Sequence, residues 1–303
     1  TSILLAALDP GELRRTIDDV VATAGGAGDY EIVVCAPFAF DAPRTRFVAE
    51  SEARGTAWAY KLAAQAARGD ILVHITDGKA LRPGWLTASL DCLAARDKGG
   101  RAFVACLPMH DPSAGDAFVG TVMGRLYPWY FATHRRTIDL LGPYFDPTFK
   151  GAFVDADFGL RVWSSGGRCE IVPGGARYDL IASARVRPPS TASVEAHAAD
   201  FRAFLGRWYP IYGGGYGAKT PDGRVDVAPW NLCYDVPSLF FDAYVREGAI
   251  VAKDPDFPRT GAFLRAAATL VRVQGREMPP DVTADPRRVP DWVRSIAAEK
   301  PAG

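Results

Sequence analysis

Residues 67–86 read ARGDILVHITDGKALRPGWL and contain the pattern that decides the fold class of this chain. The apolar run Ile71–Ile75 ends at Thr76-Asp77-Gly78, which predicts a short buried strand followed by a turn. Beyond Pro83, apolar residues recur at helical spacing up to Leu93, which predicts a helix that begins after the proline. A strand, a turn and a helix in this order form the repeating unit of α/β proteins.

The same alternation extends to both sides of this stretch. Asp9 can cap a helix that Pro10 begins, because proline fits the first helical position. The pattern predicts strands at Ser2–Leu8, Tyr30–Cys35 and Arg101–Leu107 and a helix at Thr56–Arg68. We therefore expect an α/β fold with a mainly parallel sheet flanked by helices, whose ligands bind at the carboxyl ends of the strands.

The texture of the sequence changes near residue 185, where a Pro-Pro-Ser stretch begins. We predict a domain over residues 1–188 and a mainly helical C-terminal extension over residues 189–303. The extension contains a glycine- and tyrosine-rich loop, Tyr212–Gly217. Its predicted helices are Ala192–Trp208, Val236–Arg246, Gly261–Val273 and Asp291–Glu299.

Composition excludes several classes of protein. The 35 Lys and Arg residues balance the 35 Asp and Glu residues, so no global field recruits nucleic acid. The five cysteines are widely spaced within apolar runs, which indicates reduced core residues. No apolar stretch is long enough to predict a transmembrane helix, and we expect a cytoplasmic protein.

Three groups of polar residues are candidates for chemistry, and each has a structural alternative. Asp77 follows a strand and could bind a divalent cation or a sugar hydroxyl, although Asp-Gly is also common in turns. Asp155 and Asp157 could act on a substrate or simply stabilise the start of a helix. The cluster His134-Arg135-Arg136 could reach a phosphate or remain in solvent.

The order of these motifs resembles the family 2 glycosyltransferases over about residues 2–210. The matching stretches are residues 67–73 leading to Leu81-Arg82-Pro83-Gly84-Trp85-Leu86, and residues 141–147 leading to residues 155–163. This resemblance implies the GT-A fold and transfer, with inversion, from a nucleotide-sugar donor to a carbohydrate or lipid-linked acceptor. It is typical of bacterial polysaccharide or glycolipid assembly, in which peripheral contact with a membrane is possible.

The resemblance also implies roles for individual residues. Asp155 takes the place of the catalytic base. Asp157 matches a second acidic position of the family, and it and Trp85 are the candidates for contact with the acceptor. Donor and diphosphate binding is expected from a group of four residues, Asp77, Lys79, Arg136 and Arg177. Asp77 would also bind Mn²⁺ or Mg²⁺, unless basic residues replace the metal.

The chain departs from the family pattern at three positions that handle the donor. Cys35 stands where an aspartate contacts the nucleotide base, Gly78 where the last metal-binding aspartate lies, and Val154 where a glutamate precedes the base. These departures leave a second hypothesis open, a catalytically silent GT-A module that binds a sugar, a nucleotide or a protein. A nucleotidyltransferase is disfavoured, because residues 8–11 supply no basic glycine-rich loop after the first strand.

Overall fold

The computed structural model describes residues 1–180 except 27, 53, 77–78, 111–116, 123–124, 144, 151 and 175–177. Beyond residue 180 it describes only residues 196, 199–200, 203–204, 206–208, 211, 240–246 and 249–252. The helices are α1 (Pro10–Thr23), α2 (Thr56–Ala66), α3 (Trp85–Arg96), α4 (Arg135–Leu141) and α5 (Val154–Ser164). Strands of the first sheet are β1 (Ser2–Ala6), β2 (Glu31–Ala36), β3 (Thr45–Ala49), β4 (Ile71–His74), β6 (Phe103–Leu107), β10 (Tyr130–His134) and β11 (Arg168–Ile171). The other strands are β5 (Lys79–Leu81), β7 (Met109–His110), β8 (Ala117–Val122), β9 (Arg125–Tyr127), β12 (Tyr178–Leu180), β13 (Phe240–Arg246) and β14 (Ala249–Ala252).

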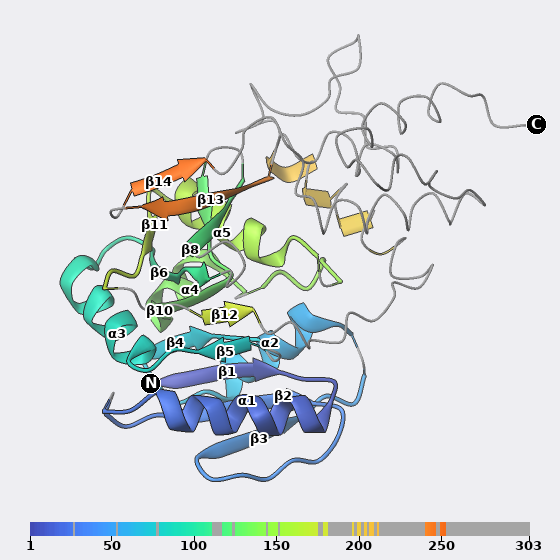
Figure 1. Cartoon of the computed structure of the whole chain (residues 1–303). Helices are drawn as coiled ribbons and strands as arrows, with labels where there is room; N and C mark the ends of the chain where they lie inside the picture. The colour runs from blue at the N-terminus through green and yellow to red at the C-terminus, as the bar shows by residue number, and fades with distance from the viewer. Residues whose placement is uncertain are drawn as a thin grey trace, which may run out of the picture. The chain divides into compact units, whose positions relative to one another are not determined.

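The first sheet is mixed and mainly parallel, with strand order β11-β6-β10-β4-β1-β2-β3 (Figure 1). β1 pairs in parallel with β2 and with β4, and β2 pairs in parallel with β3. β10 is antiparallel to both of its neighbours, β4 and β6. The predicted succession of strands and helices is confirmed, and the structure adds β3, which the sequence pattern did not reveal.

Helices cover both faces of this sheet, as its nearly unbroken apolar strands require. On one face, α1 and α3 pack in a single hydrophobic cluster with alternate residues of the strands, such as Leu5, Val34 and Val73. On the other face, Tyr60 of α2 and Phe158 of α5 lie among aromatic side chains of β4 and β10. The first sheet and its helices therefore form a three-layer α/β/α arrangement.

The second sheet has the order β14-β13-β8-β7-β12-β5 and begins where strands of the first sheet end. β7 follows β6 after Pro108 alone, and β5 follows β4 after four residues. β12 lies between them, antiparallel to β5 and parallel to β7. The carboxyl ends of β4 and β6 are thus continuous with this second sheet.

The C-terminal prediction is wrong in one element. Residues 240–246 form strand β13, whereas the sequence predicted a helix over Val236–Arg246. Their sequence, FFDAYVR, is rich in aromatic and β-branched residues that favour a strand once a neighbouring edge is present.

Part of the predicted extension agrees with the structure, and much of it lies outside the described residues. Each described residue from 196 to 208 is helical, with Asp200, Phe204 and Trp208 buried at a spacing of four. The predicted helices Gly261–Val273 and Asp291–Glu299 and the Tyr212–Gly217 loop lie outside the described residues. One compact unit comprises Thr1–Gly120, Arg125–Val186 and Ala243–Val251, and the division of the chain at residue 188 stays a prediction.

Candidate functional site

The strand order places a topological switch point between β1 and β4. From β1 the chain proceeds outward through β2 to β3, and then returns to the other side of β1 to form β4. Ligands of open α/β sheets bind at the carboxyl ends of the strands that flank such a point. The residues that follow β1 and β4 are therefore the first candidates for a binding site.

The end of β4 is held firmly, although Asp77 itself lies outside the described residues. The Tyr130 hydroxyl donates to the Thr76 carbonyl oxygen over 2.5 Å and lies 2.8 Å from the Thr76 hydroxyl. The Tyr130 ring stacks on Tyr178 of β12, with ring centroids 4.0 Å apart. These contacts fix the backbone on the N-terminal side of Asp77 and join it to the second sheet.

β5, which follows Asp77, is anchored on α1. The Leu81 amide donates to a carboxylate oxygen of Asp19 over 2.7 Å. Partial burial raises the pKa of Asp19 despite this hydrogen bond. Lys79 is the first residue of β5, opposite Leu180 of β12. Arg177 precedes β12 directly and lies outside the described residues.

The structure places Trp85, a candidate for contact with the acceptor, in the hydrophobic core. Trp85 is 0% exposed, and its indole nitrogen donates to the Thr23 hydroxyl over 3.2 Å. The side chain belongs to the hydrophobic cluster between α1 and α3. Its position in a family motif reflects core packing beneath the start of α3.

Asp155 lies in the first turn of α5, at the same edge of the sheet as the end of β4. Phe158, one turn further along α5, stacks on Phe131 of β10 with centroids 5.2 Å apart. Phe131 is the register partner of His74, the last residue of β4. The start of α5, and with it Asp155, therefore lies beside the carboxyl end of β4.

The backbone at the start of α5 adopts a costly conformation. Phe153 has φ 61° and ψ 6°, in the left-handed region that side chains other than glycine rarely occupy. Asp155 is half-buried, and its Oδ1 accepts the Ala156 amide over 2.8 Å. Positive φ values at non-glycine residues gather at functional sites, and the helix N-terminus favours the ionised carboxylate.

A buried aromatic cluster connects β4 to both helices of this face. The His74 ring lies 4.2 Å from the ring of Tyr60, 5.2 Å from Phe131 and 5.0 Å from Phe145. Burial lowers the pKa of His74 to about 3, so the imidazole is neutral. The Tyr60 hydroxyl donates to the Ile75 carbonyl oxygen over 2.6 Å, which ties α2 to the end of β4.

Asp157 has a structural role and cannot touch an acceptor where it stands. It is 0% exposed, and its carboxylate accepts the Arg161 Nε over 2.9 Å. Arg161 in turn donates to the carbonyl oxygens of Leu141 and Pro143. The pair therefore positions the segment between α4 and α5.

The basic cluster at residues 134–136 lies at the opposite edge of the sheet. β10 is antiparallel to β4 and ends beside Ile71, the first residue of β4. Arg136 pairs there with Asp97 over 2.5 Å. Arg136, a candidate for contact with the donor diphosphate, therefore lies at the edge that carries the amino ends of the parallel strands.

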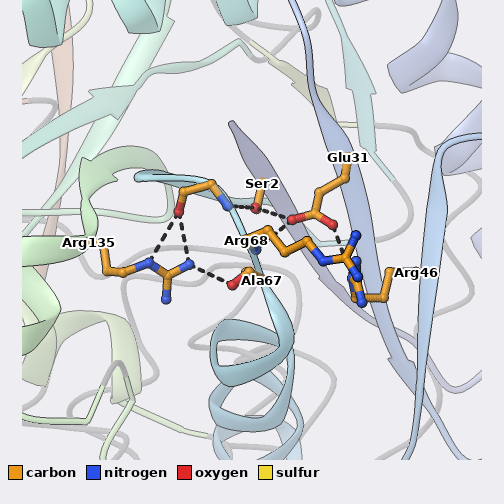
Figure 2. A network of polar contacts seen from close by, with 7 residues as sticks. Ser2, Glu31, Arg46, Ala67, Arg68 and Arg135 are labelled. Carbon is orange, nitrogen blue, oxygen red and sulfur yellow. Dashed lines mark hydrogen bonds and ion pairs between the residues drawn. The ribbon is translucent and has the colours of Figure 1, made fainter.

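Arg135 closes the C-terminal end of α2 at this same edge (Figure 2). Its guanidinium donates to the carbonyl oxygens of Ala64, Ala67 and Gly69 over 2.8–3.2 Å. A cation at the C-terminus of a helix satisfies orphan carbonyls and the helix dipole.

A second part of the network in Figure 2 is centred on Glu31. Its carboxylate accepts the Ser2 hydroxyl, the Arg68 amide and the Arg46 Nε. These contacts join the starts of β1 and β2 to β3 and to the end of α2. The whole network stabilises the edge remote from the candidate site.

Two polar features were not foreseen from the sequence. Glu50, directly after β3, is a buried carboxylate at the carboxyl-end edge. The one feature of the sequence that could have marked Glu50 is its place directly after β3, and β3 was not predicted.

The second feature is a charged group on the second sheet, formed by Arg82, His110 and Asp179. Asp179 lies 2.7 Å from the His110 Nδ1 and accepts two hydrogen bonds from Arg82, each over 3.1 Å. Partial burial raises the pKa of Asp179, but these partners outweigh it and lower the pKa overall. Asp179 alternates with Tyr178 along β12, so the group lies on the face of the second sheet away from Tyr130. These contacts join β7 and β12 to the residue that directly follows β5.

The sequence at the end of β4 offers one carboxylate for a metal ion, that of Asp77, which lies outside the described residues. Mg²⁺ and Mn²⁺ prefer several oxygen ligands, and here Gly78 follows the single carboxylate of Asp77. Among the described residues, no three His, Cys, Asp or Glu side chains gather where they could hold an ion. We therefore assign no chemical step to a metal ion.

Comparison with known proteins supports the fold. No family model and no curated protein sequence matches the chain. The mannosyltransferase PcManGT from Pyrobaculum calidifontis, in complex with GDP-Man and Mn²⁺, is 15% identical, with a TM-score of 0.52 over 99% of this chain and 81% of its own. GalNAc-T7 with UDP, GalNAc and Mn²⁺ is 14% identical, with a TM-score of 0.51 over 70% of this chain and 48% of its own. TarS 1-349 from S. aureus is 11% identical, with a TM-score of 0.48 over 69% of this chain and 73% of its own. The chain shares the GT-A fold of PcManGT and GalNAc-T7. None of its described helices has the length and hydropathy needed to cross a membrane.

Proposed function

We propose that this chain transfers a sugar from a nucleotide-sugar donor to a hydroxyl acceptor with inversion, in the assembly of a polysaccharide or glycolipid. The observation that carries the proposal is the placement of Asp155 beside the end of β4, at the switch point of a GT-A sheet. The neighbours PcManGT and GalNAc-T7 were crystallised with GDP-Man and with UDP and GalNAc, which supports a nucleotide-sugar donor.

In this mechanism Asp155 is the general base. Its carboxylate takes the proton of the acceptor hydroxyl as the acceptor oxygen forms a bond to the anomeric carbon. The bond from that carbon to the diphosphate breaks on the opposite side, and the nucleoside diphosphate leaves. A positioned base contributes about 10²- to 10⁴-fold in rate.

The negative charge of the leaving group needs a cation. Lys79 is the first residue of β5 and lies opposite Leu180 of β12, and Arg177 directly precedes β12 in the sequence. We assign the charge balance to these two residues in place of a bound metal, since fixed cations act on phosphoryl groups as metals do.

Substitution of Asp155 tests the base assignment. We expect Asp155→Asn to bind the donor as the parent does and to lose transfer by about 10²-fold or more. Asp139→Asn on the exposed side of α4 is the matched control and should retain both properties. Transfer by Asp155→Asn at the parental rate would remove Asp155 from the mechanism.

Chelator tests the assignment of Lys79 and Arg177. Full transfer in excess chelator, lost in Lys79→Ala or Arg177→Ala, is the expected result. Strict dependence on Mn²⁺ would contradict the replacement of the metal by basic residues.

A second candidate function is a silent GT-A module that binds a nucleotide or a sugar without turnover. The burial of Cys35, at the position where the related family has a base-binding aspartate, favours it. Donor binding without transfer to any acceptor tested, in the parent chain itself, would favour this alternative over the enzyme.

A further inference from the structure

Glu50 is a carboxylate held almost out of water at the edge of the sheet where ligands of this fold bind. It follows β3 directly, and its backbone amide donates to the Ala36 carbonyl oxygen at the end of β2 over 3.0 Å. The side chain is 5% exposed. Its Oε1 accepts the Arg54 amide over 2.8 Å, whereas Oε2 has no hydrogen-bond partner among the described residues.

No cation among the described residues neutralises this carboxylate. The nearby guanidinium of Arg54 pairs with the exposed Glu52 instead. Burial and, second to it, the charge of Glu50 raise the pKa of the neighbouring Cys35 thiol to about 11, so the thiol remains neutral. Among the described residues, Oε2 of this little-exposed carboxylate is therefore free to accept hydrogen bonds from a ligand.

The position of Glu50 relative to the switch point matches one part of a nucleotide. The leaving diphosphate of the proposed function lies at the ends of β4 and β1. From β4 to β3 there are three strand spacings, about 14 Å. A nucleoside diphosphate laid across the strand ends from β4 therefore brings its base to the ends of β2 and β3, where Glu50 lies.

The chemistry of the carboxylate distinguishes between bases. An ionised carboxylate only accepts hydrogen bonds and has two parallel oxygens. Guanine presents two adjacent donors, N1–H and N2–H, to such a pair. Uracil presents a single N–H between two carbonyl oxygens, and adenine and cytosine each present an acceptor beside their amino group, which repels a carboxylate oxygen.

We propose that Glu50 binds the guanine base of the donor nucleotide and thereby makes this chain selective for guanosine-diphosphate sugars. This inference rests on the proposed function, because it assumes that a nucleotide binds at this edge. Its chemistry concerns Glu50 alone and is independent of Asp155.

Equilibrium binding of free nucleoside diphosphates to the full chain tests the inference. We expect the parent chain to bind GDP at least 10-fold more tightly than UDP or ADP. Inosine diphosphate, which lacks the 2-amino group, should bind about 10-fold more weakly than GDP. Glu50→Gln should weaken the binding of GDP by 10- to 100-fold and leave the binding of UDP unchanged, because hydrogen bonds to a charged carboxylate are stronger than those to a neutral amide.

Glu52→Gln is the matched control, because this carboxylate is two residues away and largely exposed. It should bind every nucleotide as the parent does. Equal weakening of GDP and UDP in Glu50→Gln would show a purely structural carboxylate and overturn the inference, as would a parent chain that prefers UDP or ADP. Failure of every nucleoside diphosphate to bind would instead overturn the proposed function.

Discussion

Acidification should destabilise this fold through His74, and the size of the effect can be worked out from its surroundings. The pKa of His74 is about 3 in the folded chain, because the ring is buried among Tyr60, Phe131 and Phe145. In the unfolded chain the ring returns to its ordinary pKa of 6.5. A folded-state pKa below the unfolded one gives stability that is complete above pH 6.5 and is lost as the pH falls.

The magnitude follows from the distance between the working pH and the unfolded pKa. At pH 5, about 1.5 units below the unfolded pKa, His74 is protonated in the unfolded chain but neutral in the folded chain. Protonation therefore stabilises the unfolded state relative to the folded state by ~2 kcal/mol. Urea unfolding of the parent and of His74→Leu, each at pH 8 and pH 5, isolates this amount. The cost of the substitution itself cancels when the two pH values are compared for each chain.

We expect the parent to lose about 2 kcal/mol more than His74→Leu between the two pH values. His134→Gln is the control, since its side chain is 25% exposed and its pKa is lowered by partial burial and then by Arg136. It should change the pH dependence less. Equal losses in the parent and in His74→Leu would refute the reasoning, because the ring would then be protonated as readily folded as unfolded.

Three further substitutions test the packing of the fold by urea unfolding. Gly55→Ala should cost at least ~3 kcal/mol, because Gly55 has φ 103° and an added Cβ would lie 2.2 Å from a backbone carbonyl oxygen. Gly25→Ala is the control and should be close to neutral, because there is open space around Gly25. Equal effects of the two substitutions would contradict the close approach at Gly55. Asp157→Asn should cost about 3 kcal/mol, since it leaves a buried arginine partner without its counter-charge, and a loss below ~1 kcal/mol would show that the pair is not needed. Arg135→Gln should cost ~1–3 kcal/mol through the lost bonds to α2, against ~0–1 kcal/mol for the half-exposed Arg136→Gln, and the reverse order would contradict the capping role.

Local patterns predicted the first sheet well because its elements satisfy local rules. Asp9 does cap α1, accepting the amides of Gly11 and Glu12, as the Asp-Pro start predicted. β4 and the helix after Pro83 occur where apolar periodicity placed them. β3 was missed because it is a short, partly exposed edge strand that begins with Thr45 and Arg46 and has no unbroken apolar run. β13 was mistaken for a helix because strand formation depends on a neighbouring edge.

The candidate site was only partly predictable, since motif position does not determine which way a side chain faces. Trp85 and Asp157 stand in family motifs, yet both are fully buried by tertiary packing. Arg136 follows a strand end, but the antiparallel direction of β10 carries it to the wrong edge of the sheet. Asp155 lies at the predicted edge, and its catalytic role stays a prediction.

The sequence by itself determined the fold class, because strand and helix periodicities and the caps between them are local properties of the chain. The tertiary structure alone decided which polar residues meet, since strand order, strand direction and burial depend on contacts between distant segments. Glu50 illustrates the difference: nothing in its neighbours marks it, and only the pairing of β3 with β2 places its carboxylate at the ligand-binding edge.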